Sequence, residues 1–411
     1  MNITYRQAIS ISFGSIVGWG AYLMPGDLFL PQAYFLGSSI AIIIGTGIIS
    51  IIAIPYINFL SKSNSTSLVR ENSIYLIAKY FSNIHVYIYS LSILIGYLSI
   101  ISLNISVLGL LKKYTPLNNL GDIYLYKINN WDIYFNDIFI SISVLLIFLF
   151  LLYKKTYISL GGQNLISIMM ILSVLVLFCI TIYDISSHKE KLFFPLNDTV
   201  SINFLSWMHI IAIMPWAYIG FESTAQLMDN ISSSKRKIKN IIYISIFSGL
   251  MFYLLLNYIV AANFNFDYFA INNSNWAMGD IISLNFGEWG FSILLIAVTC
   301  SVLSGINGFI IISKKVIDNL NELNLLPVFL SKKINIYSSL LILAFCIFCV
   351  LLGRNNLVNI VKFSSFGISI GFVYICIANL KDNWMYSKRW RVLSILPIIM
   401  SILLFLFSAI L

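Results

Sequence analysis

Two glycine-bearing stretches inside apolar segments hold the residues that are best placed to do chemistry. The first is Gly14–Gly20 (GSIVGWG) and the second is Pro215–Glu222 (PWAYIGFE). Glycine and proline both weaken a helix, and an unwound turn frees N–H and C=O groups that lipid cannot hydrogen-bond. Such breaks persist where they line a cavity enclosed by protein, so the two stretches together predict a small-molecule site.

An unwound helix offers the two partners that a zwitterion needs. The half that leaves the break presents N–H groups at the positive end of its dipole, which attract a carboxylate. The half that enters the break presents carbonyls, which attract an ammonium group. We therefore expect the N–H groups of residues 18–20 to bind a carboxylate and the carbonyls of residues 217–219 to bind an amine. The expected substrate-binding residues are Ser15, Val17, Gly18, Trp19, Gly20, Trp216, Ala217, Tyr218, Ile219 and Gly220.

Three side chains near the breaks have two interpretations each. Glu222 is a carboxylate deep in an apolar segment, where a charge is a functional candidate by default. It could carry a proton, or it could be a protonated group bonded to a neighbouring carbonyl. Trp216 could be an aromatic gate over the ligand or a packing residue. Trp19 could cap the site or fill space.

The composition places the chain in a membrane. Of its 411 residues, 59% are apolar and only 10% are charged, whereas soluble domains carry about 25% charged residues. The mean hydropathy is +0.89. The net charge of +9 does not indicate nucleic-acid binding, because the basic residues lie in short clusters between apolar runs and form no continuous face.

The apolar runs predict eleven membrane-spanning helices. If the N-terminus is cytoplasmic, most of the 25 Lys and Arg residues fall on the inner side, as the positive-inside rule requires. The C-terminus is then outside. Polar stretches at 112–137, 186–201 and 263–288 are expected to be outer loops. The predicted segments are 6–33, 36–60, 84–111, 138–153, 158–185, 202–228, 238–262, 289–313, 334–352, 356–380 and 392–411.

The order of the segments predicts an inverted repeat. Segments one to five and six to ten cover similar lengths, and each set begins with a segment that contains a break. Five is an odd number, so the second set enters the membrane from the opposite face. We expect a first repeat at residues 1–185, an inverted second repeat at 202–380 and an extra transmembrane helix at 388–411.

Four motifs resemble those of the amino acid–polyamine–organocation (APC) permeases. Ile16–Pro25 (IVGWGAYLMP) is similar to the first-helix motif of that family and Trp216–Ser223 (WAYIGFES) to its sixth-helix motif. Ser234–Ile238 resembles the charged loop that follows, without its prolines, and Ser313–Asp318 resembles the cytoplasmic end of the eighth helix. The resemblance implies an all-α, leucine-transporter-type core with discontinuous helices 1 and 6, alternating access, and amino acids or related amines as substrates.

The chain departs from the family pattern at three points. Trp19 stands where the family usually has a small hydroxyl residue between the two glycines. The fifth segment has no lysine between Ile166 and Tyr183, although some members use such a lysine in place of sodium. Many members have twelve spans, and eleven are predicted here.

These observations predict a secondary active transporter of the cytoplasmic membrane that is coupled to protons or works by exchange. The alternative is a receptor of the same fold that senses an amino acid without moving it. An enzyme is not expected, because His85, His188 and His209 lack an evident acidic partner. No cofactor is expected either. Substrate identity, direction and oligomeric state stay open, with a preference for a neutral, apolar amino acid.

Metal sites are also not expected. The five cysteines all lie inside apolar segments, which argues against zinc or disulfides. Ser301 and Ser304 could hold sodium together with the carbonyls of Gly14 or Val17. Serines within helices, however, more often bond back to their own backbone.

Overall fold

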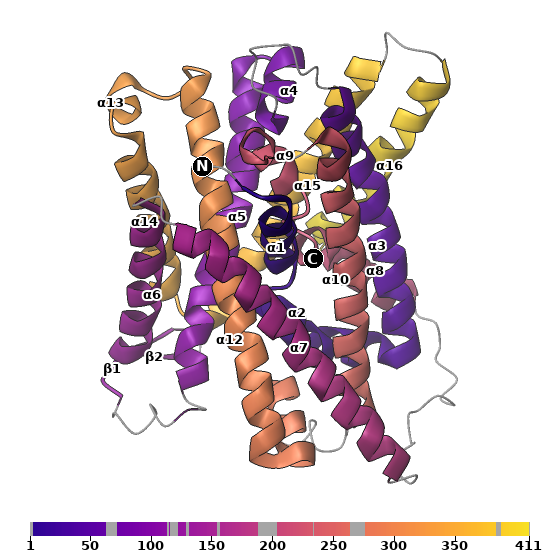
Figure 1. The fold of residues 1–411 in the computed structure, drawn as a ribbon, viewed down its shortest axis with the longest axis vertical. Coiled ribbons are helices and arrows are strands. Elements are labelled where there is room, and N and C mark those ends of the chain that lie inside the picture. The colour runs from indigo at the N-terminus through magenta and orange to yellow at the C-terminus, as the bar shows by residue number, and fades with distance from the viewer. Residues whose placement is uncertain are drawn as a thin grey trace.

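The protein is an all-α bundle. The computed structural model describes residues 3–62, 72–112, 115, 122–128, 131–153, 157–187, 204–232, 234–263, 276–383 and 388–410. Eight helical stretches in these ranges are long and apolar enough to cross a membrane (Figure 1). His188 and most of the polar stretch 186–201 lie outside the described residues.

All eleven predicted segments fall on helices. The first is divided into α1 (Tyr5–Ile16), α2 (Trp19–Met24) and the π-helix η1 (Pro25–Phe29). The sixth is divided into α8 (Phe204–Ala217) and α9 (Ser223–Leu227). The other nine are α3 (Leu30–Lys62), α5 (Asn83–Lys112), α6 (Phe135–Tyr153), α7 (Tyr157–Ser187), α10 (Lys235–Asn263), α12 (Ala277–Glu322), α14 (Ile334–Leu351), α15 (Arg354–Asn383) and α16 (Lys388–Ile410).

Two kinks agree with predicted segment boundaries. Tyr34 interrupts α3 with φ 52° and ψ −169°, between the first predicted segment and the second. Gly287 interrupts α12 with φ 63° and ψ −158°, just before the eighth predicted segment. Residues within an α-helix have a φ of about −60°, so the positive φ at each of these positions interrupts the helix and turns the chain.

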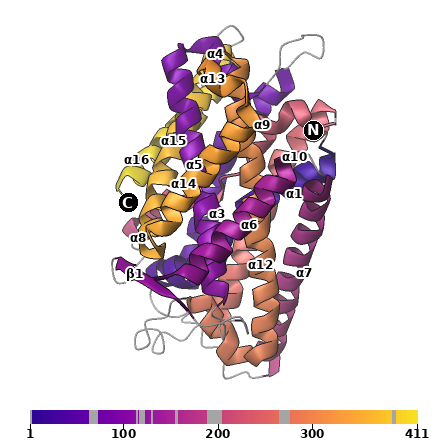
Figure 2. The same cartoon turned by 90° about the vertical axis from the view of Figure 1, so that its left-hand side faces the viewer.

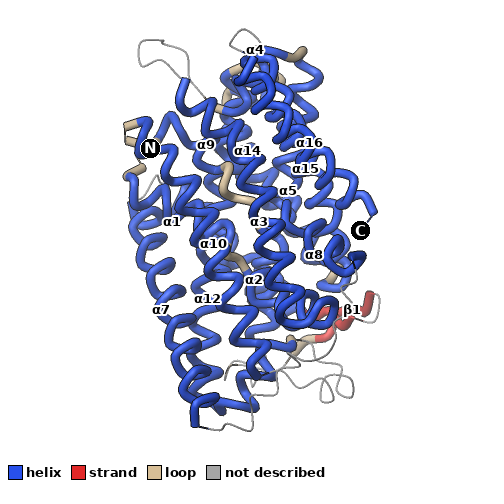
Figure 3. The backbone as a smooth tube through the Cα atoms, turned by 90° about the vertical axis from the view of Figure 1, so that its right-hand side faces the viewer, coloured by secondary structure: helices blue, strands red, loops and turns tan. Residues whose placement is uncertain are grey.

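Short elements occupy the polar stretches. Helix α4 (Ser73–Tyr80) begins at Asn72, whose Oδ1 accepts the N–H groups of Ile74 and Tyr75 at 3.1 and 3.2 Å. Strands β1 (Tyr124–Ile128) and β2 (Trp131–Tyr134) pair antiparallel in one hairpin. The 3₁₀ turn η4 (Met228–Asn230) and helix α13 (Val328–Ser331) are two further short elements. Figure 3 shows this hairpin beside an otherwise helical tube.

One predicted outer loop is in part a buried helix. The stretch 263–288 was expected to be polar loop, but residues 277–286 form the first part of α12. Ala277 packs so closely on η1 that a Cβ at Gly26 would lie 2.6 Å from its own. The apolar residues Met278, Ile281 and Ile282 are fully buried, so burial against the first segment overrides the polar composition of the stretch.

The broken helices lie at the centre of the bundle. Helix α1 packs against α7, α10 and α12, while α5 packs against α12 and α15. Helices α6 and α14 lie side by side on the outside, where most of their apolar side chains face away from the protein (Figure 2). Helices α4 and α13 lie at one end of the molecule and the β1–β2 hairpin at the other.

Candidate functional site

The two predicted breaks are present and they cross. Helix α1 ends at Ile16 and α2 begins at Trp19, and α8 ends at Ala217 before α9 begins. Gly220 lies in the second break with φ +114°, a conformation that other residues rarely adopt. A Cβ at Gly220 would lie 3.1 Å from the carbonyl carbon of Ser15 and would collide with its side chain. Glycine is therefore required where the two backbones meet.

A tyrosine from α10 braces both breaks. The Tyr253 hydroxyl lies 2.8 Å from the Ala217 carbonyl and 3.2 Å from the Ile16 carbonyl. Its single hydrogen is shared between two acceptors that helix unwinding has freed. The Ala217 carbonyl, which was expected to bind an amine, is thus already occupied. The Ile219 carbonyl accepts no hydrogen bond from a described residue.

An asparagine from α5 occupies part of the expected carboxylate site. Asn104 is 1% exposed, and its Oδ1 accepts the Trp19 N–H at 3.1 Å. Its Nδ2 has no hydrogen-bond partner among the described residues. The N–H groups of Gly18 and Gly20 also donate to no described residue. Three unused donors therefore remain at the first break.

These groups surround a small cavity between the breaks. It measures about 20 Å³, which is room for about one water molecule. An amino acid does not fit until the walls move apart, so this conformation is closed around the site. Of the expected residues, Ser15, Gly18, Trp19, Gly20, Trp216, Ala217 and Ile219 line the cavity. Sequence reasoning missed Ile16, Ala21, Met24, Ile100, Leu103, Asn104 and Tyr253.

Three expected residues do not line this cavity. The Val17 carbonyl accepts the Ser301 hydroxyl at 2.8 Å. The Tyr218 hydroxyl lies 2.7 Å from Thr46 Oγ1 on α3, and its ring packs on Tyr253 with ring centroids 5.7 Å apart. Gly220 contacts Ser15 where the two broken helices cross. These three residues therefore position the backbone around the cavity and do not line it.

Both tryptophans line the cavity, and they have different neighbours. The Trp216 ring lies against Gly20, where an added Cβ would come within 2.9 Å of its Cζ2. Its Nε1 has no hydrogen-bond partner among the described residues. Trp19 is fully buried and packs on Trp276, with ring centroids 5.1 Å apart. Trp216 therefore walls the cavity, and Trp19 fills the space between α2 and the first part of α12.

Comparison with protein families gives one match along nearly the whole chain. Residues 3–411 match the family model described as amino acid permease. The chain belongs to the APC superfamily of amino acid permeases. Comparison with curated proteins finds no significant match. The predicted resemblance is confirmed, and the permease is a multi-pass membrane protein of a family of transporters whose substrates are amino acids or related amines.

Glu222 is built into the second break of the permease. It is 2% exposed, and its Oε2 accepts the Gly220 N–H at 3.0 Å. It is the only carboxylate among the fully buried described residues. Tyr56, Tyr89 and Tyr97 are close enough to interact with it electrostatically. The Glu222 carboxyl group thus stabilises the unwound turn through Gly220, and it also lies near the hydroxyl groups of these three tyrosines.

The serines that could have bound sodium are engaged by the permease itself. Ser301 donates to Val17, and Ser304 Oγ accepts from Gln163 Nε2 at 2.7 Å. Gln163 on α7 also donates to the Ser10 carbonyl at 3.1 Å and accepts from Asn307 at 2.9 Å. This neutral network ties α1 to α7 and α12. In the described ranges, no three His, Cys, Asp or Glu side chains gather as a metal site would require.

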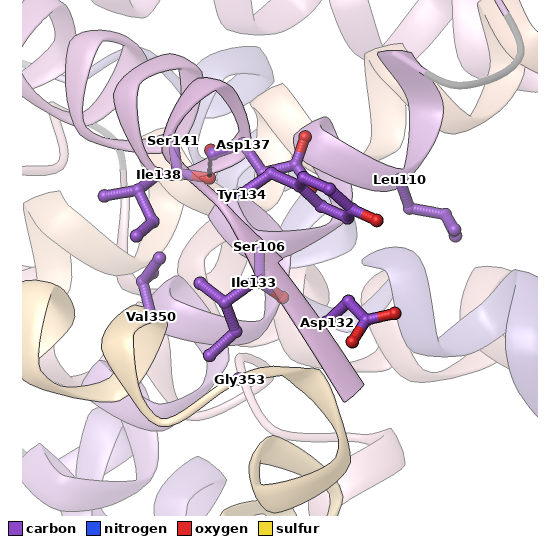
Figure 4. Close-up of a pocket in the computed structure, with 10 residues that line it drawn as sticks. All are labelled: Ser106, Leu110, Asp132, Ile133, Tyr134, Asp137, Ile138, Ser141, Val350 and Gly353. Carbon is purple, nitrogen blue, oxygen red and sulfur yellow. Dashed lines mark hydrogen bonds between the residues drawn. The ribbon is translucent and has the colours of Figure 1, made fainter. Parts of the chain in front are cut away.

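A second cavity in the permease lies beside the β1–β2 hairpin. It measures about 40 Å³ and lies between β2, α5, α6 and the turn after α14 (Figure 4). Asp132, Tyr134 and Asp137 line it, and the Ser141 hydroxyl on the same wall donates to the Asp137 and Ile105 carbonyls at 2.7 and 2.8 Å. None of its lining residues comes from α1, α2, α8 or α9, so it is separate from the breaks.

Proposed function

We propose that the permease is a secondary active transporter that carries a neutral, apolar amino acid across the cytoplasmic membrane by alternating access. The observation that carries this proposal is the crossing of two broken helices around a small cavity with unused polar backbone groups. Unused N–H and C=O groups inside a membrane protein are costly unless a ligand satisfies them. Discontinuous helices of this kind form the midplane sites of transporters.

The unused groups suggest how the substrate binds. The Gly18 and Gly20 N–H groups and Asn104 Nδ2 are three donors for a carboxylate, and the Ile219 carbonyl is an acceptor for an ammonium group. Met24, Ile100 and Leu103 supply an apolar wall for the substrate side chain. No charged side chain lines the cavity, which favours a neutral amino acid over a cationic or anionic one.

The transport cycle requires the two halves of the protein to move against each other. We assign residues 1–185 and 202–380 to two inverted five-helix repeats, and 388–411 to an extra helix. The N-terminus is assigned to the cytoplasm by the positive-inside rule, because most Lys and Arg residues fall between predicted segments on the side that the N-terminus shares. Trp216 moves off Gly20 when the cavity opens and acts as the gate.

Coupling is assigned to protons or to exchange. Glu222 is the buried carboxylate at the break, so it can take up and release a proton as the surrounding helices move. Sodium coupling is disfavoured because Ser301 and Ser304 are bonded within the protein. A protonated carboxyl group accepts the Gly220 N–H more weakly than a carboxylate does, so protonation would loosen the second break and link proton binding to opening.

Counterflow of a labelled amino acid in proteoliposomes tests the proposal. Vesicles loaded with unlabelled substrate should accumulate label above equilibrium if the protein is a carrier. The receptor alternative predicts binding without accumulation. A thermal-shift screen of the purified protein against neutral amino acids and polyamines selects the substrate first, and stabilisation by none of them would contradict the substrate class.

A further inference from the structure

A larger cavity lies at the α4 and α13 end of the permease, apart from the site between the breaks. Its volume is about 490 Å³, within the range of about 300–1,000 Å³ that is typical of small-molecule sites. Ile3, which precedes α1, and Leu227, the last residue of α9, form part of its wall. The ends of both broken helices therefore border this cavity, which we name the end vestibule.

The end vestibule has charges of both signs on α12. Lys315 forms an ion pair with Asp229 of η4 at 3.8 Å. Lys314, next to it, forms no ion pair or hydrogen bond with a described residue, and its electrostatic partner is Asp318. Residues four apart on a helix lie on one face with Cβ atoms about 5–6 Å apart. Lys314 and Asp318 thus present a positive and a negative charge side by side on the wall.

The wall is held in place by contacts between the two broken helices. The Ile3 N–H donates to the Asn230 carbonyl at 2.7 Å, and the Ser232 N–H donates to the Ile3 carbonyl at 2.9 Å. Deeper in the bundle, Ser12 Oγ lies 2.7 Å from Ser223 Oγ. These contacts fasten α1 to the chain around α9, so the shape of the end vestibule changes when either broken helix moves.

We propose that the end vestibule is a second, transient binding site for the transported zwitterion. The Lys314 ammonium binds the substrate carboxylate and the Asp318 carboxylate binds the substrate amine. Ile311, Ile334 and Leu152 on the walls accept an apolar side chain. The inference rests on the proposed function, because it takes the same amino acid as ligand, and it adds a site where the substrate waits before or after the midplane cavity.

Sided transport kinetics test this proposal. Uptake of the labelled amino acid is measured in right-side-out and inside-out membrane vesicles, which gives a KM for each face. We expect Lys314→Gln and Asp318→Asn each to raise the KM at the face of the end vestibule by about tenfold, since each removes one charge-assisted contact. The KM at the opposite face should stay within about twofold, because the midplane site is untouched.

Two further variants separate recognition from folding. Lys333→Gln removes an exposed lysine at the same end that does not line the cavity, and it should leave both KM values unchanged. The double variant Lys314→Asp with Asp318→Lys restores one charge of each sign and should recover most of the lost affinity. If a variant does not transport, equilibrium dialysis of the purified protein should give two bound amino acids for the wild type and one for the variant.

Several results would overturn the proposal. Unchanged KM values at both faces in both single variants would show that the substrate passes through the end vestibule without binding there. An equal rise at both faces would show that the pair acts through the fold. A binding ratio of one in the wild type would exclude a second site. A wild type that transports no amino acid in either vesicle type would contradict the proposed function itself, and that result is known before any variant is made.

Discussion

Gly220 lies directly against Ser15, so that the second broken helix crosses the first where it has no side chain of its own. The φ of +114° at Gly220 and the collision that a Cβ there would make with Ser15 are two independent reasons why this position must be glycine. The contact places the freed backbone of both helices around one cavity. The positions of the remaining site groups follow from it.

Gly220→Ala tests this crossing. Forcing a side chain into a rarely allowed φ region costs of the order of 1–3 kcal/mol, and the contact with Ser15 adds to that cost. We expect the variant to unfold at a temperature several degrees lower and to bind substrate poorly. Gly47→Ala is the matched control, because Gly47 lies in α3 with nothing within 4 Å of an added Cβ. Equal melting temperatures for the two variants would contradict the description of the crossing.

Tyr253→Phe tests the brace between the breaks. The change removes one oxygen and leaves the Ala217 and Ile16 carbonyls without their donor. Leaving a buried polar group unsatisfied costs about 1–3 kcal/mol. Thermal unfolding in detergent should show this loss, while Tyr243→Phe, an exposed position on the same helix, should behave like the wild type. A Tyr253→Phe protein as stable as the wild type would mean that other groups satisfy these carbonyls.

Asn104 variants test the carboxylate site. Asn104→Ala removes the unused donor together with the acceptor of the Trp19 N–H, and the lost donor alone should weaken amino acid binding about tenfold, the worth of one hydrogen bond to a charged group. Asn104→Asp places a negative charge beside the bound carboxylate and should weaken binding further. Ser106→Ala changes a neighbouring α5 residue that bonds only to its own helix and should have no effect. Binding isotherms measure all three, and wild-type affinity in Asn104→Asp would place the carboxylate elsewhere.

Glu222→Gln tests proton coupling. The amide oxygen of glutamine can still accept the Gly220 N–H, so the break should remain intact. The variant can no longer bind or release a proton at this position. We expect exchange of labelled for unlabelled substrate to persist, while uptake driven by a pH gradient is lost. Wild-type dependence of transport on pH in Glu222→Gln would remove this residue as the proton carrier.

The breaks themselves could be predicted from sequence because they obey a local rule. Glycine and proline within a membrane segment mark a place where helical hydrogen bonds fail, and both Gly18 and Gly220 lie in such stretches. The segment boundaries near Tyr34 and Gly287 followed from hydropathy in the same way. These features depend on residues that are close together in the chain.

The side chains that complete the site could not be predicted, because their partners are distant in the chain. Asn104 is 85 residues from Trp19, and Tyr253 is 237 residues from Ile16. An asparagine or a tyrosine in an apolar run has many possible partners until helix packing selects one. An intramembrane polar residue is a functional candidate by default, and that rule alone would have drawn attention to Asn104. The buried helix at 277–286 also depends on packing. Its residues Ala277, Met278, Ile281 and Ile282 have helical spacing, but the run is too short to be predicted as a membrane span.

A structure of the purified permease with a bound neutral amino acid tests the central claim most directly. We predict that the substrate carboxylate lies within hydrogen-bond distance of the Gly18 and Gly20 N–H groups and its amine beside the Ile219 carbonyl, with Trp216 displaced from Gly20. An amino acid bound away from both breaks, with α1 and α8 continued as unbroken helices, would contradict it.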